Sequence, residues 1–129
     1  MNLTSLGTAD CAHWGLTAAT TFDHKAGVTP LISNYTVAGG GTVNNYGNNP
    51  TGYTWTGGTP DASATNSTTG VYIPGLNKGF TISAPADATT RTLTVYAGVY
   101  RSQGKMVAHL SDGSAPDYVD TSLSNQAGV

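Results

Sequence analysis

The sequence predicts an all-β protein, an antiparallel sandwich of two sheets with a jelly-roll-like topology. Composition is the first reason: the 129 residues include 17 Gly and 21 Thr, only 9% are charged, and Glu is absent. Thr, Val and Tyr favour strands, Gly, Asn, Asp and Pro favour turns, and few residues remain that suit exposed helix faces. The second reason is a two-residue alternation of apolar side chains, which is typical of half-buried strands.

The clearest alternation lies in Thr90–Tyr100 and predicts the most distinct strand. Its aliphatic positions are every second residue, namely Leu93, Val95, Ala97 and Val99. Residues 101–104 are typical of a turn, and Lys105–Ser111 resumes the period of two. We therefore expect a β-hairpin between residues 90–100 and 105–111.

Shorter strands are expected along the rest of the chain. They are Ala9–Leu16, Thr21–Lys25, Leu31–Val37, Gly79–Ala84 and Tyr118–Leu123. Short strands at roughly ten-residue spacing, separated by turn residues, are the signature of a sandwich or barrel. A length of 129 residues fits one domain, so we expect a single domain spanning 1–129.

Aromatic residues in a polar segment are the first candidates for a ligand site. Residues 39–69 are rich in Gly and Asn, predict a long loop, and contain Tyr46, Tyr53 and Trp55. Tyr96 and Tyr100 share one face of the strand expected at 90–100 and extend this set. Sugar rings stack on Tyr and Trp, so carbohydrate is the expected ligand. The alternative is that the same rings pack inside the sandwich.

Acidic residues near the C-terminus suggest a metal site. Asp112, Asp117 and Asp120 fall in a Gly/Pro-containing stretch, and carboxylates with backbone carbonyls are the ligands of Ca²⁺. A structural calcium is therefore one interpretation; the other is that these residues start turns, and no further cofactor is expected.

A soft-metal site is the second metal hypothesis. Cys11 and His13 fall on one face of the strand expected there, and His24 or His109 could complete a shell. Packing roles for these side chains are the alternative, because a free Cys behaves as a small hydrophobe.

Enzymatic chemistry is not expected. Glycoside hydrolysis needs two carboxyl groups facing one another across a cleft, and Asp117 and Asp120 would point to opposite faces of a strand. Asp112 and Asp117 could converge through the turn, but the sequence gives no sign of an apolar pocket that would raise the pKa of either. No Gly-x-Ser-x-Gly elbow occurs for a nucleophilic serine.

Charge and hydropathy exclude two classes of partner. The net charge is −2 and the five Lys and Arg are scattered, so a basic footprint for nucleic acid is missing. No stretch approaches the length of a membrane span, and no signal peptide is expected in residues 1–129.

Four segments carry a resemblance to a known group of proteins. They are Thr8-Ala9-Asp10-Cys11-Ala12-His13-Trp14-Gly15, Phe22-Asp23-His24-Lys25, Ile32-Ser33-Asn34-Tyr35 and Leu110-Ser111-Asp112-Gly113-Ser114-Ala115-Pro116-Asp117-Tyr118. The chain resembles β-sandwich modules of secreted bacterial multi-module surface proteins, and similar modules accompany polysaccharide-active enzymes. The resemblance implies a β-sandwich and a secreted or cell-surface parent protein, and it implies no catalytic residues.

Two departures from that group shape the expectations. An aromatic residue is usual where Cys11 stands, and the modules continue with strands beyond the point where this chain stops. The resemblance thus implies a sandwich incomplete at its C-terminus, with an open sheet edge. We expect a second copy to cover that edge by strand addition or exchange, which makes the protein a homo-oligomer.

Three functions follow, in order of expectation. The first is a non-catalytic carbohydrate-binding module of a secreted or surface protein. The second is a structural or adhesive module that associates with itself, and the third is a glycoside-active enzyme.

Overall fold

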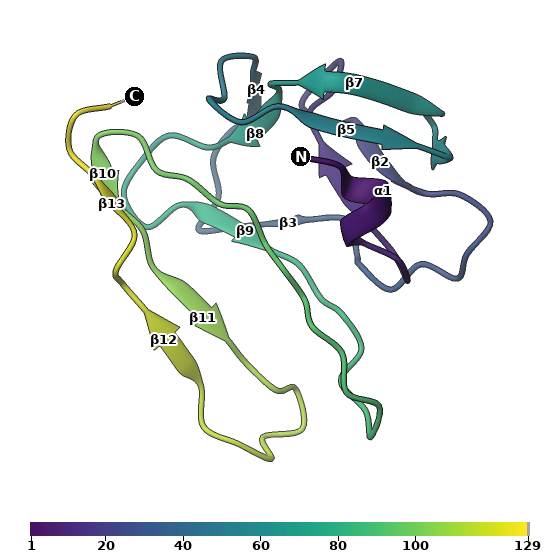
Figure 1. The fold of residues 1–129 in the computed structure, drawn as a ribbon. Coiled ribbons are helices and arrows are strands. Elements are labelled where there is room, and N and C mark those ends of the chain that lie inside the picture. Colours follow the sequence, from purple (N-terminus) through teal and green to yellow (C-terminus); the bar gives the residue numbers. More distant parts are fainter. Residues whose placement is uncertain (129) are drawn as a thin grey trace. The chain divides into compact units, whose positions relative to one another are not determined.

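The computed structural model describes residues 1–128 and confirms the all-β class. Strands are distributed along the chain from Ala12 to Asn125, and the described residues hold one short helix, α1 (Figure 1). The paired strands form small antiparallel sheets. The arrangement of these sheets as a two-layer jelly-roll sandwich stays a prediction. No helix within residues 1–128 is both long and apolar enough to traverse a bilayer.

The chain divides into two compact units, Met1–Pro85 and a second that begins at Ala86, and each is described by itself. The single domain expected over residues 1–129 stays a prediction.

The first unit contains one three-stranded sheet and three strand pairs. The sheet has the order β1 (Ala12–Trp14), β2 (Phe22–Lys25), β6 (Gly58–Thr59). The pairs are β3 (Thr36–Ala38) with β9 (Gly79–Thr81), β4 (Asn44–Tyr46) with β8 (Gly70–Tyr72), and β5 (Tyr53–Thr56) with β7 (Ser63–Ser67).

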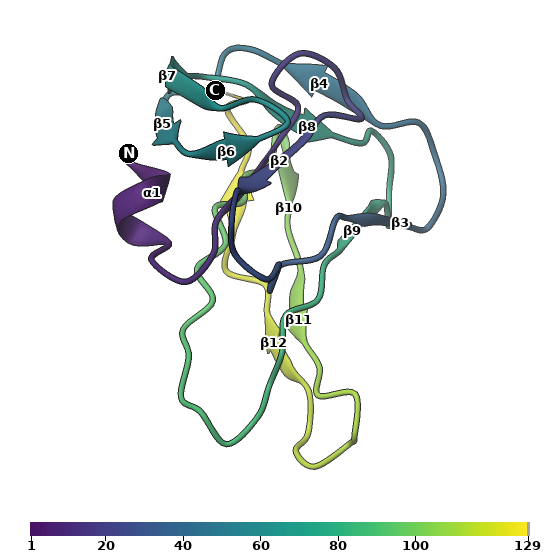
Figure 2. The ribbon, with the colours of Figure 1, turned by 90° about the vertical axis from the view of Figure 1, so that its right-hand side faces the viewer.

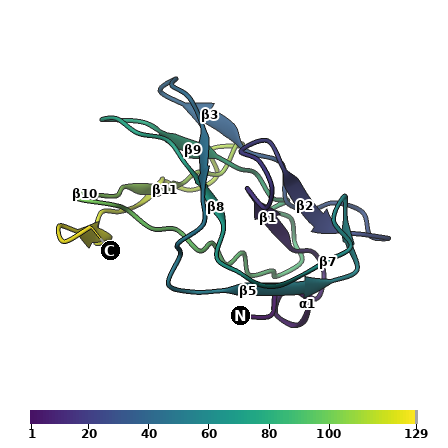
Figure 3. The ribbon, with the colours of Figure 1, turned by 90° about the horizontal axis from the view of Figure 1, so that it is seen from above.

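The core of the first unit forms where α1 (Leu3–Leu6) meets β5 (Figure 3). Asn2 caps the helix by accepting a hydrogen bond from the Ser5 amide, which satisfies one donor of the first turn. Leu3 is then buried against Tyr53 and Trp55, and half-buried Cys11, Leu16 and Ala64 pack around them. Tyr53 and Trp55 point to the same side of β5 because side chains alternate along a strand.

The described residues of the second unit, 86–128, form two strand pairs. They are β10 (Ser102–Gln103) with β13 (Ser124–Asn125) and β11 (Met106–Ala108) with β12 (Tyr118–Asp120), and the second pair runs side by side in Figure 2.

Two expectations of local structure are corrected. Residues 39–69 do not form one long loop, because β4, β5, β6 and β7 all lie within that range. No strand is assigned in residues 86–101, so the hairpin expected between 90–100 and 105–111 is wrong: β11 pairs with β12 instead. A strand exists only where a neighbour completes its hydrogen bonds, and alternation alone does not supply that neighbour.

Candidate functional site

Two buried polar side chains face one another across β1 and β2. The strand register places His13 opposite Asp23, and residues opposite one another in an antiparallel pair share a face. Both are buried, with exposed fractions of 7% for His13 and 2% for Asp23. Trp14 and Phe22 form the next opposite pair, so their stacked rings lie on the other face.

His13 is held as a neutral ring. Its Nε2 lies 3.1 Å from the Thr69 carbonyl oxygen, and a carbonyl only accepts, so Nε2 carries the proton and donates. Burial lowers the pKa of His13, and the ring packs 4.8 Å from the Trp55 ring. Its Nδ1 is buried and has no hydrogen-bond partner among the described residues.

Asp23 joins this cluster to the turn that follows β6. Its Oδ1 accepts a hydrogen bond of 3.1 Å from the Asp61 amide, and the Trp55 indole donates to the Asp61 carbonyl at 3.2 Å. Burial raises the pKa of the Asp23 carboxyl because the charged form is poorly solvated there. Its Oδ2 also lacks a partner among the described residues.

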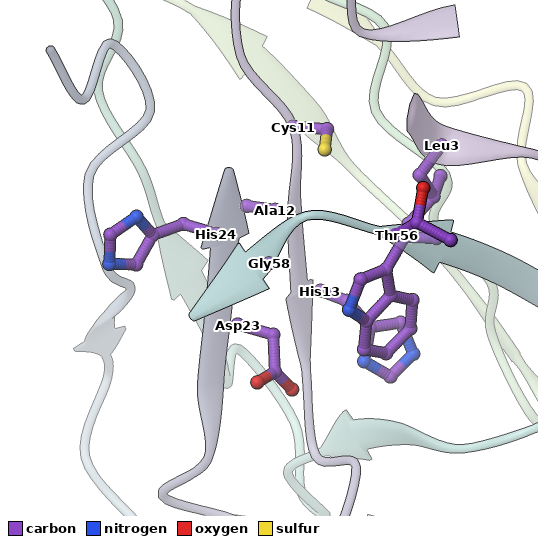
Figure 4. Close-up of a pocket in the computed structure, with 9 residues that line it drawn as sticks. Leu3, Cys11, Ala12, His13, Asp23, His24, Thr56 and Gly58 are labelled. Atoms are coloured by element: carbon purple, nitrogen blue, oxygen red, sulfur yellow. The ribbon is translucent and has the colours of Figure 1, made fainter. Parts of the chain in front are cut away.

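The hollow beside these groups is small. It is lined by Cys11 and by residues of α1, β1, β2, β5 and β6, and its volume is about 10 Å³ (Figure 4). That volume admits about one water molecule, whereas ligand pockets usually hold several hundred Å³. The hollow beside His13 and Asp23 is therefore far smaller than an ordinary ligand pocket.

The structure does not bring together the ligands expected for a soft metal, namely Cys11 and His13 with His24 or His109. Within residues 1–128 no three His, Cys or Asp side chains lie close enough together to hold a metal ion. Figure 4 shows His24 pointing away from Asp23 across β2, as expected for neighbouring residues of a strand. Burial raises the pKa of the Cys11 thiol, which makes it a weaker metal ligand.

The three carboxylates considered for calcium have separate local partners. Asp112 accepts from the Ser114 amide at 2.9 Å, and Asp120 accepts from the Ser122 amide at 2.7 Å. Hydrogen bonds from these serines lower the pKa of both carboxyls. Asp117 lies 2.7 Å from Nδ1 of His109. The structure does not bring the three together: Asp112 lies in a turn, Asp117 precedes β12, and Asp120 ends that strand.

The aromatic candidates separate into buried and exposed groups. Tyr53 and Trp55 belong to the core, so their ring faces are not open to a sugar, and Tyr46 packs edge-on against Tyr72 with centroids 6.3 Å apart. Tyr96 and Tyr100 are exposed in the second unit, at 45% and 66%. Of the five candidates, these two have the most exposed rings, and the Arg101 guanidinium lies 5.5 Å from the centroid of the Tyr100 ring.

Exposed apolar side chains are concentrated in the second unit. Met106 and Val107 are neighbours on β11 and therefore face opposite ways, yet they are 50% and 45% exposed. Both faces of the β11–β12 ladder are thus about half exposed at this position. Other exposed apolar or aromatic residues of this unit are Leu93, Val95, Tyr96, Tyr100, Leu110, Tyr118, Val119 and Leu123.

The segment without a strand lies in the same unit. We call residues 90–100 the open segment; it runs as an extended trace in Figure 1 and carries the alternating pattern described above. Leu93, Thr94 and Val95 make no backbone hydrogen bond to any described residue. An extended segment of this kind is a template for another strand.

One structural residue escaped the sequence reasoning. The Asp10 carboxylate accepts hydrogen bonds from three backbone amides, those of Cys11 at 2.8 Å, Leu31 at 2.7 Å and Ile32 at 2.9 Å. Asp10 is thereby a buried link between β1 and the segment before β3. No signal in the sequence ties it to residues 21 and 22 positions away.

Searches with the chain against protein-family models, curated proteins and solved structures found no match.

Proposed function

We propose that this chain is a non-catalytic structural module that associates with a second copy of itself through its second unit. The observation that carries the proposal is that one unit holds both the half-exposed β11–β12 ladder and the open segment, which has no strand partner among the described residues. It favours the second of the three functions expected from the sequence.

The physical case rests on how sheets are stabilised. An isolated pair of strands is marginally stable in water, and at least three strands with a covered apolar face are usually needed. Large apolar patches on a soluble protein commonly mark an interface. Self-association would supply both a further strand and apolar cover for residues such as Met106 and Val107, which are half exposed in one chain.

The absence of catalysis is part of the proposal. The buried His13 and Asp23 have room for about one water beside them, and Asp112, Asp117 and Asp120 each bond locally. These contacts give the side chains structural roles.

Light scattering during gel filtration tests the proposal. The wild-type protein should elute with twice the 13.1 kDa mass of one chain. Val95→Lys should shift the protein to monomer, because a lysine within an exposed strand is a natural block to strand addition. Val95 is 49% exposed in the single chain, so the lysine can be solvated there without disturbing the fold.

Val37→Lys is the matched control, since it makes the same chemical change on β3, a strand already paired with β9. It should leave the dimer intact. A monomeric wild-type protein at every concentration would contradict self-association. A dimer that persists in both Val95→Lys and Val37→Lys would contradict the placement of the interface at the open segment.

Carbohydrate binding is the second candidate function, and the exposure of Tyr96 and Tyr100 favours it. The two residues lie four positions apart and project from the same face of an extended segment. Both candidates fit a secreted or surface-exposed parent protein.

A glycan array with the purified chain tests this second candidate. Retention on a polysaccharide should be lost in the double variant Tyr96→Ala/Tyr100→Ala and kept in Tyr118→Ala, which removes an exposed ring from β12. Binding that persists in the double variant would exclude these two rings as the sugar platform.

A further inference from the structure

We infer that Asp23 and Asp61 share one proton, which sits on Oδ2 of Asp23 and is donated to the Asp61 carboxylate. This proton links β2 to the turn after β6. Both residues belong to the first unit, so the inference does not depend on the self-association proposed for the second.

Backbone hydrogen bonds hold Asp61 against Asp23. The Asp61 amide donates to Oδ1 of Asp23 at 3.1 Å, and the Asp61 carbonyl accepts from the Trp55 indole at 3.2 Å. Neither bond uses the Asp61 carboxyl group, and a side-chain hydrogen bond joins that group to the Asp23 carboxyl. The two carboxyl groups are therefore direct neighbours.

A hydrogen bond between two carboxyl groups requires a proton. Ionised carboxylates only accept, so two of them side by side would repel one another. Oδ2 of Asp23 is closed to solvent and has no donor partner among the described residues, and Asp23 as a whole is only 2% exposed. A proton on Oδ2 turns this oxygen into a donor with the Asp61 carboxylate as its acceptor, and it removes a charge from a place that water does not reach.

The surroundings of Asp23 favour its protonated form. Burial is the largest cause that raises the pKa of Asp23, and both the charge of Asp61 and the bond between the two carboxyl groups raise it further. The Asp61 amide acts the other way, because its bond to Oδ1 favours the charged form. Asp23 therefore binds its proton more tightly in the folded chain than in the unfolded chain.

The other titratable groups near Asp23 influence it less than Asp61 does. His13 lies opposite on β1 and is held as a neutral ring. Cys11 lines the same hollow, and burial raises the pKa of its thiol, which keeps the thiol neutral. His24 points away from Asp23 across β2 (Figure 4), and its charge has the smallest of the influences on the pKa of Asp23.

The shared proton makes the protein less stable as the pH rises. Below about pH 3.9, the pKa of an unfolded Asp, both the folded and the unfolded chain hold this proton and its contribution is fully present. At higher pH the unfolded chain releases the proton first, so the free energy of unfolding declines until the pH has passed through the raised pKa of Asp23.

Asp23→Asn tests the inference, because an amide carries permanently the hydrogen that the proton supplies. The Asn oxygen can still accept from the Asp61 amide while its Nδ2 donates to the Asp61 carboxylate. In urea unfolding at about pH 8, we expect Asp23→Asn to raise the folded-to-unfolded ratio about tenfold over the wild type. At about pH 4 the two proteins should be nearly equal in stability.

Asp10→Asn is the matched control, since it makes the same chemical change at another buried Asp. The Asp10 carboxylate accepts from three backbone amides, so an Asn there loses acceptor capacity and brings a donor toward other donors. This variant should be less stable than the wild type at both pH values.

Asp61→Ala identifies the source of the gain. It removes the acceptor of the shared proton and leaves both backbone bonds of residue 61 in place. In that background the gain from Asp23→Asn should shrink from about tenfold to about twofold. An undiminished gain would mean that burial of Asp23 alone is responsible, and a loss of stability in Asp23→Asn at about pH 8 would mean that Asp23 is ionised. Either result would overturn the inference.

Carboxyl-carbon NMR of the folded protein provides a second measurement that needs no change at Asp23. The pKa of Asp23 should fall in Asp61→Asn, because the new amide donates to the ionised carboxylate without any proton. A pKa of Asp23 that is the same in the wild type and in Asp61→Asn would also overturn the shared proton.

Discussion

Removing the Asp10 carboxylate should lower the stability of the protein more than removing an Asp carboxylate whose hydrogen bonds are all to neighbouring residues. Asp10 is 8% exposed, and two of its three hydrogen bonds join it to Leu31 and Ile32, across 21 and 22 residues. Asp10→Ala leaves these amide donors without their acceptor in a place that water reaches poorly.

The magnitude follows from the three bonds. Hydrogen bonds to charged groups contribute about 1.5–3 kcal/mol each, and bonds to one carboxylate are not independent. We therefore expect Asp10→Ala to lower the free energy of unfolding by about 3–5 kcal/mol, a large share of the 5–15 kcal/mol typical of a domain.

Urea unfolding followed by tryptophan fluorescence measures this loss, because Trp55 is 3% exposed and becomes solvated on unfolding. With a denaturant slope of about 1–3 kcal/mol/M, the midpoint should fall by at least about 1 M. Asp112→Ala is the control: it removes an exposed carboxylate with one bond to the Ser114 amide, and we expect a change below about 0.5 kcal/mol. A loss under about 1 kcal/mol for Asp10→Ala, at unchanged slope, would refute the role assigned to this carboxylate.

Two further predictions concern the same unit. Gly15 has a φ of +85°, and a Cβ there would lie 2.6 Å from the Gly70 carbonyl oxygen, so Gly15→Ala should cost about 1–3 kcal/mol in a urea titration. Gly27→Ala, at φ +72° with no atom within 4 Å, should cost less; equal losses would show that crowding at Gly15 is unimportant. His13 has a folded-state pKa below 6.5, so the stability it supports is present above that pH and lost as the pH falls through the lowered pKa. Unfolding free energies measured between about pH 7.5 and 5 should therefore fall more steeply for the wild type than for His13→Gln, and parallel curves would contradict a buried neutral His13.

The all-β class could be predicted because its signals are local. Thr and Gly content and the scarcity of Glu and Lys act residue by residue, so composition was sufficient. Residues 53–56 contain a strand signal that the prediction of a loop passed over. Tyr and Trp alternate there with Thr, and this two-residue period indicates a strand with one buried face. The Gly and Asn residues around it suggested a loop and obscured that signal.

The pairing of strands could not be predicted because it depends on distant residues. Residues 90–100 show the best alternation in the chain but form no ladder among the described residues, while β11 pairs with β12. The hydrogen bonds of Asp10 could not be predicted for the same reason, because the fold brings its amide partners at Leu31 and Ile32 to it from 21 and 22 residues away. Carbohydrate binding, a bound calcium and a surface location stay predictions.

Hydrogen exchange at the amides of Leu93, Thr94 and Val95 tests the central claim most directly. These amides have no hydrogen-bond partner within the described part of one chain, so any protection must come from another strand. Self-association predicts slow exchange at high protein concentration and faster exchange on dilution or in Val95→Lys. Exchange at the rate of an unstructured peptide at every concentration would contradict it.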